Sequence, residues 1–331
     1  MLRALRRLAL GLAVTVSCLL LVAALLLQWR PSIEGWPRWP VEAGQGPVSV
    51  TYLGTSTLLI SDGRTRLLTD GYFTRVSRLA TLTRPLAPDP ERIRAVLSRH
   101  RIDSLDAVLV LHTHFDHVLD SPWVAERTGA DLVGSESSAN VGRGAGLAES
   151  RLRVVTPGEP LHYGDFEVIF LPSEHVPQSP WLDRLTGMNE TIDQPLAAPA
   201  PVDAWKEGES WVVLIRHPSV SLVIQGSAGF VEEQLQGYQA DVAFLSSVGL
   251  SRQRSGYVAD YVRHTVTATG ASRVVPIHWD DFFVPWRGER TPALPWLMEN
   301  MEASFAALRA ESEAAGAQFL VVRPGQTLSL P

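Results

Sequence analysis

The sequence predicts a mixed α/β body with two stacked sheets flanked by helices, preceded by an apolar N-terminal segment. Hairpin-forming strand patterns are mixed with helix patterns from residue 48 onward, which favours stacked sheets over one doubly wound sheet. An uncharged run of residues precedes this body at the N-terminus. A group of histidines directly follows a continuous apolar strand pattern, as is typical of a site at the edge of a sheet.

Composition supports a folded body and argues against some partners. A chain of 331 residues with 45% hydrophobic and 19% charged residues is long and apolar enough to bury a large core. The first 30 residues contain four arginines and no acid, so the rest of the chain carries a net charge of about −10. Such a body repels phosphate backbones, and we therefore expect no nucleic-acid partner.

The N-terminal segment, residues 1–30, predicts a membrane anchor. Residues 8–27 are uncharged and long enough to cross a bilayer as a helix. Arg3, Arg6 and Arg7 precede this run and favour a cytoplasmic N-terminus. We therefore expect a single-pass protein of the inner (cytoplasmic) membrane, with its body on the periplasmic or extracytoplasmic side.

Two other interpretations of this segment remain open, and both also send the body out of the cytoplasm. One is a cleaved signal peptide, although signal segments usually have a shorter apolar run. The other is lipidation at Cys18, the only cysteine, which a weak preceding motif disfavours. Residues 31–47 are rich in Pro, Gly and Trp and predict a stiff linker or a strap lying on the body, which spans residues 48–331.

The first elements of the body are strands. Residues 48–52 alternate in polarity, residues 57–61 are apolar, and the Asp62-Gly63 turn predicts a hairpin to residues 65–69. A helix is expected over residues 89–100, where Asp-Pro marks its start.

A continuous apolar run at residues 107–111 predicts a buried strand. The long Pro-rich segment 178–208 is typical of either a binding loop or a disordered insertion. Hydrophobic periodicity predicts further helices at residues 122–128, 231–238, 257–269 and 297–315. It predicts further strands at residues 131–134, 152–155, 166–171, 211–216, 219–225, 241–245, 274–277, 318–322 and 327–330.

The candidate site begins with the run His112-x-His114-x-Asp116-His117 after the apolar strand. Alternate side chains of an extended chain point the same way, so His112 and His114 can face one point, with Asp116 in the same phase. Imidazole nitrogens suit zinc and its neighbours, and a carboxylate adds a harder ligand. Because the chain has nine histidines, three within six positions argue against chance. The run predicts parts of two metal sites.

This run matches the H-x-H-x-D-H motif of the metallo-β-lactamase superfamily, and the chain resembles that superfamily from residue 48 to its end. Residues 52–57 (YLGTST), 67–70 (LLTD) and 276–280 (PIHWD) resemble the branch that includes N-acyl phosphatidylethanolamine phospholipase D and lactonases. The resemblance implies a four-layer αββα sandwich with the metals at one edge of the β-layers.

The resemblance also implies a ligand set. The first metal would be held by His112, His114 and His175, which follows the strand expected at residues 166–171. The second would be held by Asp116, His117 and His278. The implied cofactor is Zn²⁺, one or two ions per chain, with Mn²⁺ as an alternative.

One position departs from the superfamily pattern. Members usually place a metal-bridging Asp after the strand expected at residues 219–225, and this chain has Ser227 there. A hydroxyl is a weaker ligand than a carboxylate and brings no negative charge between two cations. Either the second site is weaker or bridged by hydroxide alone, or the chain is a catalytically impaired descendant.

The resemblance implies hydrolysis of an ester, lactone or phosphodiester by a metal-bound hydroxide. Asp116 would orient the nucleophile and accept its proton. Asp70, at the end of a strand, would hold a ligand histidine from behind; the alternative is a simple turn residue.

Substrate contacts are expected from aromatic residues. Trp279 and Phe282 beside His278, and Trp181 and Trp205 in the long loop, are candidates for an apolar pocket, with core packing as the alternative. The expected substrate is a small molecule, including lipid-like ones because of the expected anchor. The competing hypothesis is a metal-binding or lipid-binding module of the same fold without catalysis.

Overall fold

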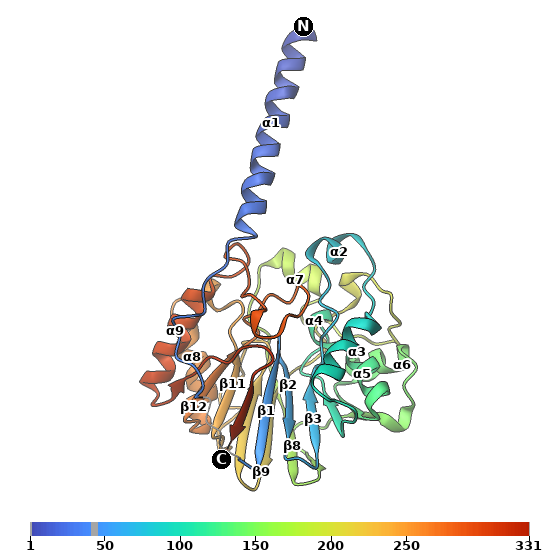
Figure 1. The fold of residues 1–331 in the computed structure, drawn as a ribbon, viewed down its shortest axis with the longest axis vertical. Coiled ribbons are helices and arrows are strands. Elements are labelled where there is room, and N and C mark those ends of the chain that lie inside the picture. The colour runs from blue at the N-terminus through green and yellow to red at the C-terminus, as the bar shows by residue number, and fades with distance from the viewer. Residues whose placement is uncertain (1, 41–45, 331) are drawn as a thin grey trace.

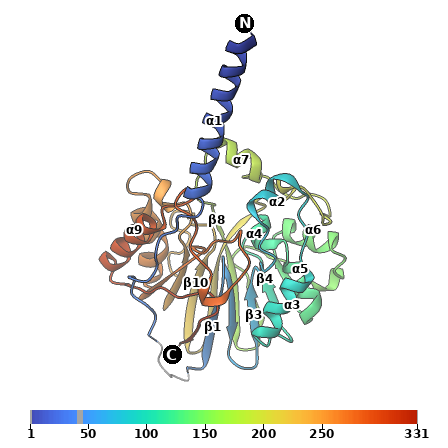
Figure 2. The same cartoon turned by 45° about the horizontal axis from the view of Figure 1, so that its top comes forward.

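The structure is a computed structural model that describes residues 2–40 and 46–330, so residues 41–45 of the expected linker lie outside the described part. Helix α1 (Leu2–Leu26) projects from one end of the body, and both views show it standing clear of the other elements (Figures 1 and 2). Its stretch Leu5–Leu26 has a mean hydropathy of 2.6 and none of it is buried. By length and composition this helix can span a membrane, and a signal sequence meets the same criteria.

The body contains two sheets, each seven-stranded within the described residues. Their strand orders are β14-β1-β2-β3-β4-β5-β6 and β13-β12-β11-β10-β9-β8-β7. The first sheet consists of β1 (Val48–Gly54), β2 (Thr57–Ser61), β3 (Arg66–Thr69), β4 (Ala107–Leu109), β5 (Asp131–Gly134), β6 (Leu152–Val154) and β14 (Thr327–Leu330). The second consists of β7 (Pro160–Tyr163), β8 (Phe166–Ser173), β9 (Ser210–His217), β10 (Val220–Gln225), β11 (Val242–Ser246), β12 (Arg273–Ile277) and β13 (Gln318–Phe319).

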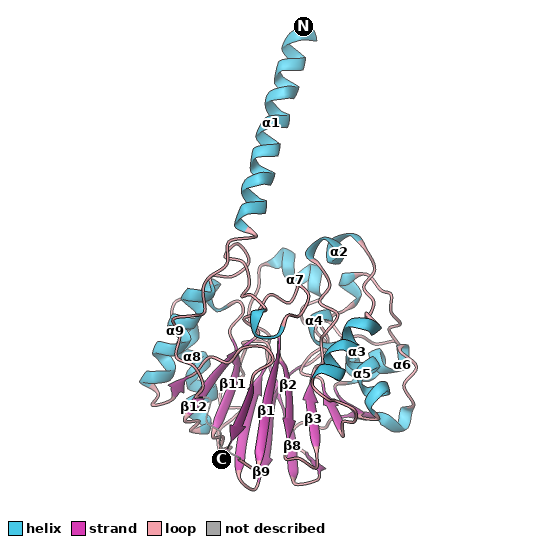
Figure 3. Ribbon diagram, in the orientation of Figure 1, coloured by secondary structure: helices cyan, strands magenta, loops and turns pink. Residues whose placement is uncertain are grey.

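Helices cover the outer faces of both sheets, which gives the expected αββα order (Figures 1 and 3). The helices beside the first sheet are α3 (Pro90–Arg99), α5 (Ser121–Thr128) and α6 (Glu136–Gly144). Those beside the second are α8 (Tyr257–Val262), which continues as a π-helical turn to Thr267, and α9 (Met301–Ala314). The short helices α2 (Arg78–Thr83), α4 (Phe115–Val118) and α7 (Pro180–Thr186) gather at the end from which α1 leaves. The predicted fold class is confirmed.

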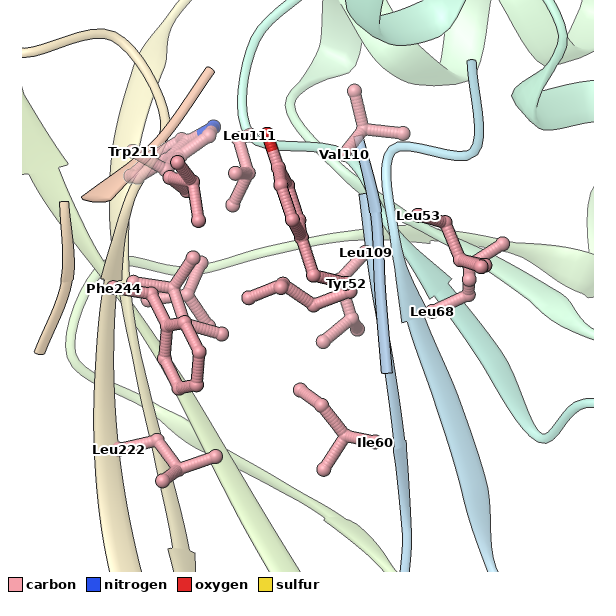
Figure 4. Packing of buried hydrophobic residues seen from close by; sticks show 14 of the residues in the cluster. Tyr52, Leu53, Ile60, Leu68, Leu109, Val110, Leu111, Trp211, Leu222 and Phe244 are labelled. Atoms are coloured by element: carbon pink, nitrogen blue, oxygen red, sulfur yellow. The ribbon is translucent and has the colours of Figure 1, made fainter. Parts of the chain in front are cut away.

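The core lies between the sheets because strand side chains alternate between two faces. In β1, Tyr52 points toward the second sheet and Leu53 points away from it (Figure 4). Ile60 from the first sheet faces Leu222 and Phe244 from the second, and all three are at most 1% exposed. The sheets are therefore held together by apolar packing, which fixes the relative position of the loops at their edges.

Residues 36–39 lie on the body as a strap, which is one of the two interpretations that the sequence left open. Trp39 donates its backbone N–H to the carbonyl of Val321, and Val321 donates to Pro37. The Trp36 ring packs edge-on against Phe305, with ring centroids 5.4 Å apart. The segment after α1 is thus fastened to the body over its described residues.

Several predicted elements need correction. The helix expected at 231–238 is a series of turns, because Glu233 has a positive φ of 62° that an α-helix does not allow. The helix expected at 297–315 begins only at Met301, because Asn300 caps it. The segment 178–208 is an ordered loop: Leu196 donates to Asn140 and Ala200 pairs with Leu86. This order favours the binding-loop interpretation over a disordered insertion.

Candidate metal centre

The predicted ligands come together at one edge of the two sheets. Strands β3 and β4 are parallel neighbours, so Asp70 after β3 and His112 after β4 leave the sheet at the same edge. In the second sheet, β8 leads to His175 and β12 leads to His278. The chain turns after His114 into the short helix α4, which carries the last two residues of the motif into the same space.

The first group consists of His112, His114 and His175. One nitrogen from each imidazole lies within 4.8 Å of the others. His112 Nε2 is 3.1 Å from His114 Nδ1, and the ring centroids of His114 and His175 are 5.0 Å apart. These side chains come from both sheets, so the group exists only in the folded chain.

The second group consists of Asp116, His117 and His278, again with one donor atom of each within 4.8 Å of the others. The Nε2 atoms of His117 and His278 face each other at 3.2 Å, and Asp116 Oδ2 lies 3.4 Å from His278 Nε2. The rings of His112 and His117 have centroids only 3.8 Å apart, so the two groups adjoin.

Hydrogen bonds on the outer nitrogens orient two imidazoles of the first group. His114 Nε2 lies 3.0 Å from the carbonyl oxygen of Thr186 in α7, and His175 Nδ1 lies 3.0 Å from that of Val176. A carbonyl only accepts, so each of these nitrogens carries the hydrogen. The other nitrogen of each ring then has its lone pair free to face the group.

Asp70 orients His117 in the same way. Its Oδ2 lies 2.7 Å from His117 Nδ1, and its Oδ1 accepts the backbone N–H of Leu111 at 2.8 Å. The side chain is fully buried and the residue has a positive φ of 51°. Asp70 thus contacts a candidate ligand directly, which a simple turn residue does not.

The electrostatics favour the metal-ligating protonation states. Burial lowers the pKa of His112 and, with the nearby His175, lowers the pKa of His114 to about 3. Burial opposes charge on Asp116, but His117 and His278 together hold the pKa of that carboxyl below its usual range. Neutral imidazoles of the first group therefore adjoin an ionised carboxylate of the second, and histidine nitrogens with a carboxylate are a donor set that fits a divalent cation such as Zn²⁺.

Ser227 lies beside the first group, with His175 and Ala228 paired across an isolated bridge. Its hydroxyl donates to the carbonyl of Glu174 at 3.2 Å and accepts from Gln225 Nε2 at 3.1 Å. The position where a bridging carboxylate was expected by resemblance thus holds a neutral hydrogen-bonded pair of side chains.

A buried network behind His278 was missed by sequence reasoning. The carboxylate of Asp280 accepts from the hydroxyl of Tyr52 at 2.7 Å and from the guanidinium of Arg75 at 2.6 Å. The side chains of Arg75 and Asp280 are both fully buried. Tyr52 also accepts from the backbone N–H of His278 at 3.2 Å, which helps to hold this residue at its φ of 58°. In the sequence, Asp280 could have been noticed because it lies two residues after the histidine that ends a strand. No sequence pattern around Arg75 indicates that it belongs to this network.

The predicted pocket aromatics divide into two kinds. Phe282 lies at the site, with its ring centroid 5.1 Å from that of His278, and Trp181 on α7 is 68% exposed. Trp279 and Trp205 are 0% and 1% exposed, so their indoles are core residues, the alternative kept open for them. Trp279 packs against Tyr52 of β1 and Phe305 of α9.

Three of the four other histidines pack against aromatic side chains. His100 packs edge-on against Trp286, His217 packs against Phe166, and His264 stacks on Phe230. His217 also lies near Asp62 and Asp165, but Asp62 accepts the backbone N–H groups of its own hairpin turn.

Comparison with known proteins supports the fold. No family model matches the chain. It is 33% identical over 93 residues to a UPF0173 metal-dependent hydrolase of Anaeromyxobacter sp. (strain K), covering 28% of each chain. It is 26% identical over 130 residues to a UPF0173 metal-dependent hydrolase of Pyrobaculum arsenaticum, covering 39% of this chain and 51% of the relative. The chain therefore matches from about a quarter to about half of the length of these curated relatives.

Solved structures match over most of the chain. The metallo hydrolase Igni18 of Ignicoccus hospitalis superposes with a TM-score of 0.52 and 17% identity, covering 85% of this chain and 97% of Igni18. An isothiocyanate hydrolase from Delia radicum gut bacteria superposes with a TM-score of 0.51 and 17% identity, covering 85% of this chain and 99% of the hydrolase. CmlA, a diiron β-hydroxylase of Streptomyces venezuelae, superposes with a TM-score of 0.52 and 14% identity, covering 87% of this chain and 55% of CmlA.

The αββα architecture and the grouped ligands at its edge define a protein of the metallo-β-lactamase fold. The chain shares this fold with solved metallo hydrolases and is similar, over part of its length, to relatives named as metal-dependent hydrolases. The narrower resemblance to the phospholipase D and lactonase branch stays a prediction.

Proposed function

We propose that this protein is a membrane-anchored, metal-dependent hydrolase with two adjoining cation sites. His112, His114 and His175 would hold one cation and Asp116, His117 and His278 the other. The observation that carries the proposal is that each group places three possible donor atoms within 4.8 Å of one another and that the two groups adjoin. When bound, a divalent cation such as Zn²⁺, or Mn²⁺ as an alternative, supplies a Lewis acid and activates water.

The chain's own residues supply orientation and proton transfer. The Asp116 carboxylate faces the second group and is ionised, so it can hold the attacking water and accept its proton. Asp70 fixes the ring of His117 and makes it the more basic, because Asp70 and Asp116 raise its pKa against the effect of burial. Phe282 forms an apolar wall next to His278 that limits access of bulk water.

The proposed substrate is an ester, a lactone or a phosphodiester, with lipid-like members of these classes included. The relatives named as metal-dependent hydrolases support hydrolysis, and the apolar helix α1 supports a site close to a membrane. We place the protein in the inner membrane with its body on the extracytoplasmic side, because Arg3, Arg6 and Arg7 precede the apolar run.

The test is turnover of a panel of esters, lactones and phosphodiesters by the full chain in detergent, with added Zn²⁺ or Mn²⁺. We expect His114→Ala to lose turnover and His162→Ala to keep it, because His162 is exposed on β7 outside both groups. Asp116→Asn should lower turnover by roughly 100- to 10,000-fold, the usual contribution of a positioned base. Equal rates from wild type and His114→Ala would defeat the hydrolase proposal.

A second function is favoured by Ser227, which occupies the position where the resemblance implied a bridging carboxylate. It is a metal-binding or lipid-binding module of the same fold without catalysis. This function predicts bound metal with no turnover of any substrate in the panel. Since a diiron β-hydroxylase shares the fold, iron belongs in the metal series as well.

A further inference from the structure

The exposed apolar side chains of the body lie at one end of the molecule. Outside α1, the large hydrophobic residues that are exposed in the described part of the chain are Trp29, Leu79, Leu82, Val154, Trp181, Trp296 and Leu297. Leu79 and Leu82 belong to α2 and Trp181 belongs to α7, and both views place these helices at the end from which α1 leaves (Figures 1 and 2). Only Val154, on the edge strand β6, stands apart from this set.

Direct contacts fix α1 and α2 to the same point. The buried carboxylate of Asp281 lies 2.5 Å from the guanidinium of Arg30, just after α1, and 2.6 Å from that of Arg78, the first residue of α2. The indole of Trp29 stacks on that of Trp296 at 5.7 Å, and Trp296 donates its backbone N–H to Trp29. The body therefore cannot swing away from the end of α1 without breaking these contacts.

The position of α1 decides what covers this end. Its 22-residue apolar stretch is unburied and needs a lipid environment over its whole length. With α1 across the bilayer as proposed above, the bilayer surface lies at the level of Trp29 and Trp296, because α1 ends at Leu26 and Arg30 is already held by the body. Indole rings favour that interfacial layer. The exposed leucines of α2 and the Trp181 indole of α7 lie at the same end of the body.

We propose that this end of the body is a docking surface for the lipid bilayer. The docking surface consists of Leu79, Leu82, Trp181, Trp296 and Leu297, continuous with Trp29. Leu79 and Leu82 are 72% and 70% exposed and lie three residues apart on one face of α2, as an interfacial helix requires. Arg84 after α2 and Arg184 in α7 are also exposed, and a guanidinium can pair with lipid phosphates.

Two helices of the docking surface, α2 and α7, reach the candidate metal centre. Helix α7 contacts the first group through the bond between Thr186 and His114. The guanidinium of Arg78 in α2 lies 5.0 Å from the ring centroid of Phe283, and Phe283 packs on Phe282 beside His278. Resting on the proposed function, this arrangement lets an amphiphilic ester or phosphodiester reach the ligands from the bilayer while its chains stay in lipid.

The test is spin labelling of the full chain in vesicles that contain anionic lipid, in a Cys18→Ser background. Single labels go to Leu79→Cys, Leu82→Cys and Trp181→Cys, with Val154→Cys as the matched exposed control and Leu20→Cys as the marker of the anchor. At positions 79, 82 and 181 we expect oxygen, which dissolves in the bilayer, to relax the spin label. We expect a water-soluble nickel complex, which stays in water, to lose its effect on the label there. At position 154 nickel should relax the label fully.

Two outcomes would overturn the docking surface. Nickel access at positions 79, 82 and 181 equal to that at 154 would place this end of the body in water. Protection from both oxygen and nickel, with dipolar broadening between labels, would mean that a second copy of the chain covers it. The label at position 20 reports separately on the anchor, and the turnover panel reports separately on hydrolysis, so failure of either is told apart from failure of docking.

Discussion

At the scale of single residues, the candidate metal centre depends on which nitrogen of each imidazole carries the hydrogen. Asp70 sets this for His117 through a 2.7 Å contact with Nδ1, so that Nε2 faces Asp116 and His278 as a lone pair. The direction of one hydrogen bond behind the site therefore controls whether the second group can bind a cation.

The substitution Asp70→Asn tests this control. The Asn oxygen can still accept from the backbone of Leu111, and Asn tolerates the positive φ, so the fold should persist. Its amide would donate to His117 Nδ1 and push the hydrogen onto Nε2, which faces the group. We expect affinity for the second cation to fall by roughly 10- to 100-fold, measured by competition with a chelator. Unchanged affinity for both cations would contradict the role given to Asp70.

The buried pair of Arg75 and Asp280 makes a second residue-scale prediction. Removing one partner leaves the other charge buried, so Arg75→Met should cost about 3–5 kcal/mol of unfolding free energy. The double variant Arg75→Met with Asp280→Asn should recover much of that loss, because no unpaired charge remains. Chemical denaturation of the full chain in detergent measures all four corners of the cycle. Additive losses would show that the two side chains are not coupled.

At the scale of elements, the start of α9 shows how a capping side chain overrides periodicity. The apolar pattern extends back to Leu297, but Asn300 Oδ1 accepts the backbone N–H of Ala303 at 3.2 Å and the helix begins at Met301. Asn300→Ala should destabilise the protein by about 1 kcal/mol, whereas Asn300→Asp should be nearly neutral. Thermal unfolding compares the two variants, and equal losses would argue against a cap.

The elements nearest the candidate metal centre were largely predictable from the sequence, since they depend on local signals. The motif from His112 to His117 follows an apolar strand, and the resemblance supplied His175 and His278. The remaining features depend on long-range contacts that no local pattern contains. Arg75 meets a carboxylate 205 positions later in the chain, and no signal around it indicates that partner.

The layer in which an aromatic residue lies is equally hard to predict. Trp279 sits one residue after the candidate ligand His278, which suggested a pocket position, but its indole is fully buried and packs against Phe305 of α9. Phe282, four residues after the same ligand, lies at the site because the chain has turned by then. Alternation predicts that neighbouring side chains diverge, but not which of the two faces the substrate.

At the scale of the whole molecule, the candidate metal centre joins the two sheets. His112, His114, Asp116 and His117 follow β4 of the first sheet, whereas His175 and His278 follow β8 and β12 of the second. A cation bound by either group would therefore link both sheets and stabilise the native state. Apolar packing between the sheets provides the remaining cohesion, so the body should stay folded without metal.

Metal removal tests this linkage. A cation at 100 times its dissociation constant adds about 2.7 kcal/mol of stability for each site. Treatment with a chelator should therefore lower the unfolding temperature while leaving the circular dichroism spectrum of the native state unchanged. Because the strap of residues 36–39 packs on Phe305 and Val321, outside both groups, variants there should not alter the effect of the chelator. An unfolding temperature insensitive to chelation would contradict a bound cation.

The most direct measurement of the central claim is the metal content of the purified full chain and of three single variants. The account predicts two cations per chain at saturation, the loss of one in His175→Ala and the loss of the other in His278→Ala, with His162→Ala unchanged. A metal content that is the same in all four proteins, or close to zero in the wild type, would contradict it.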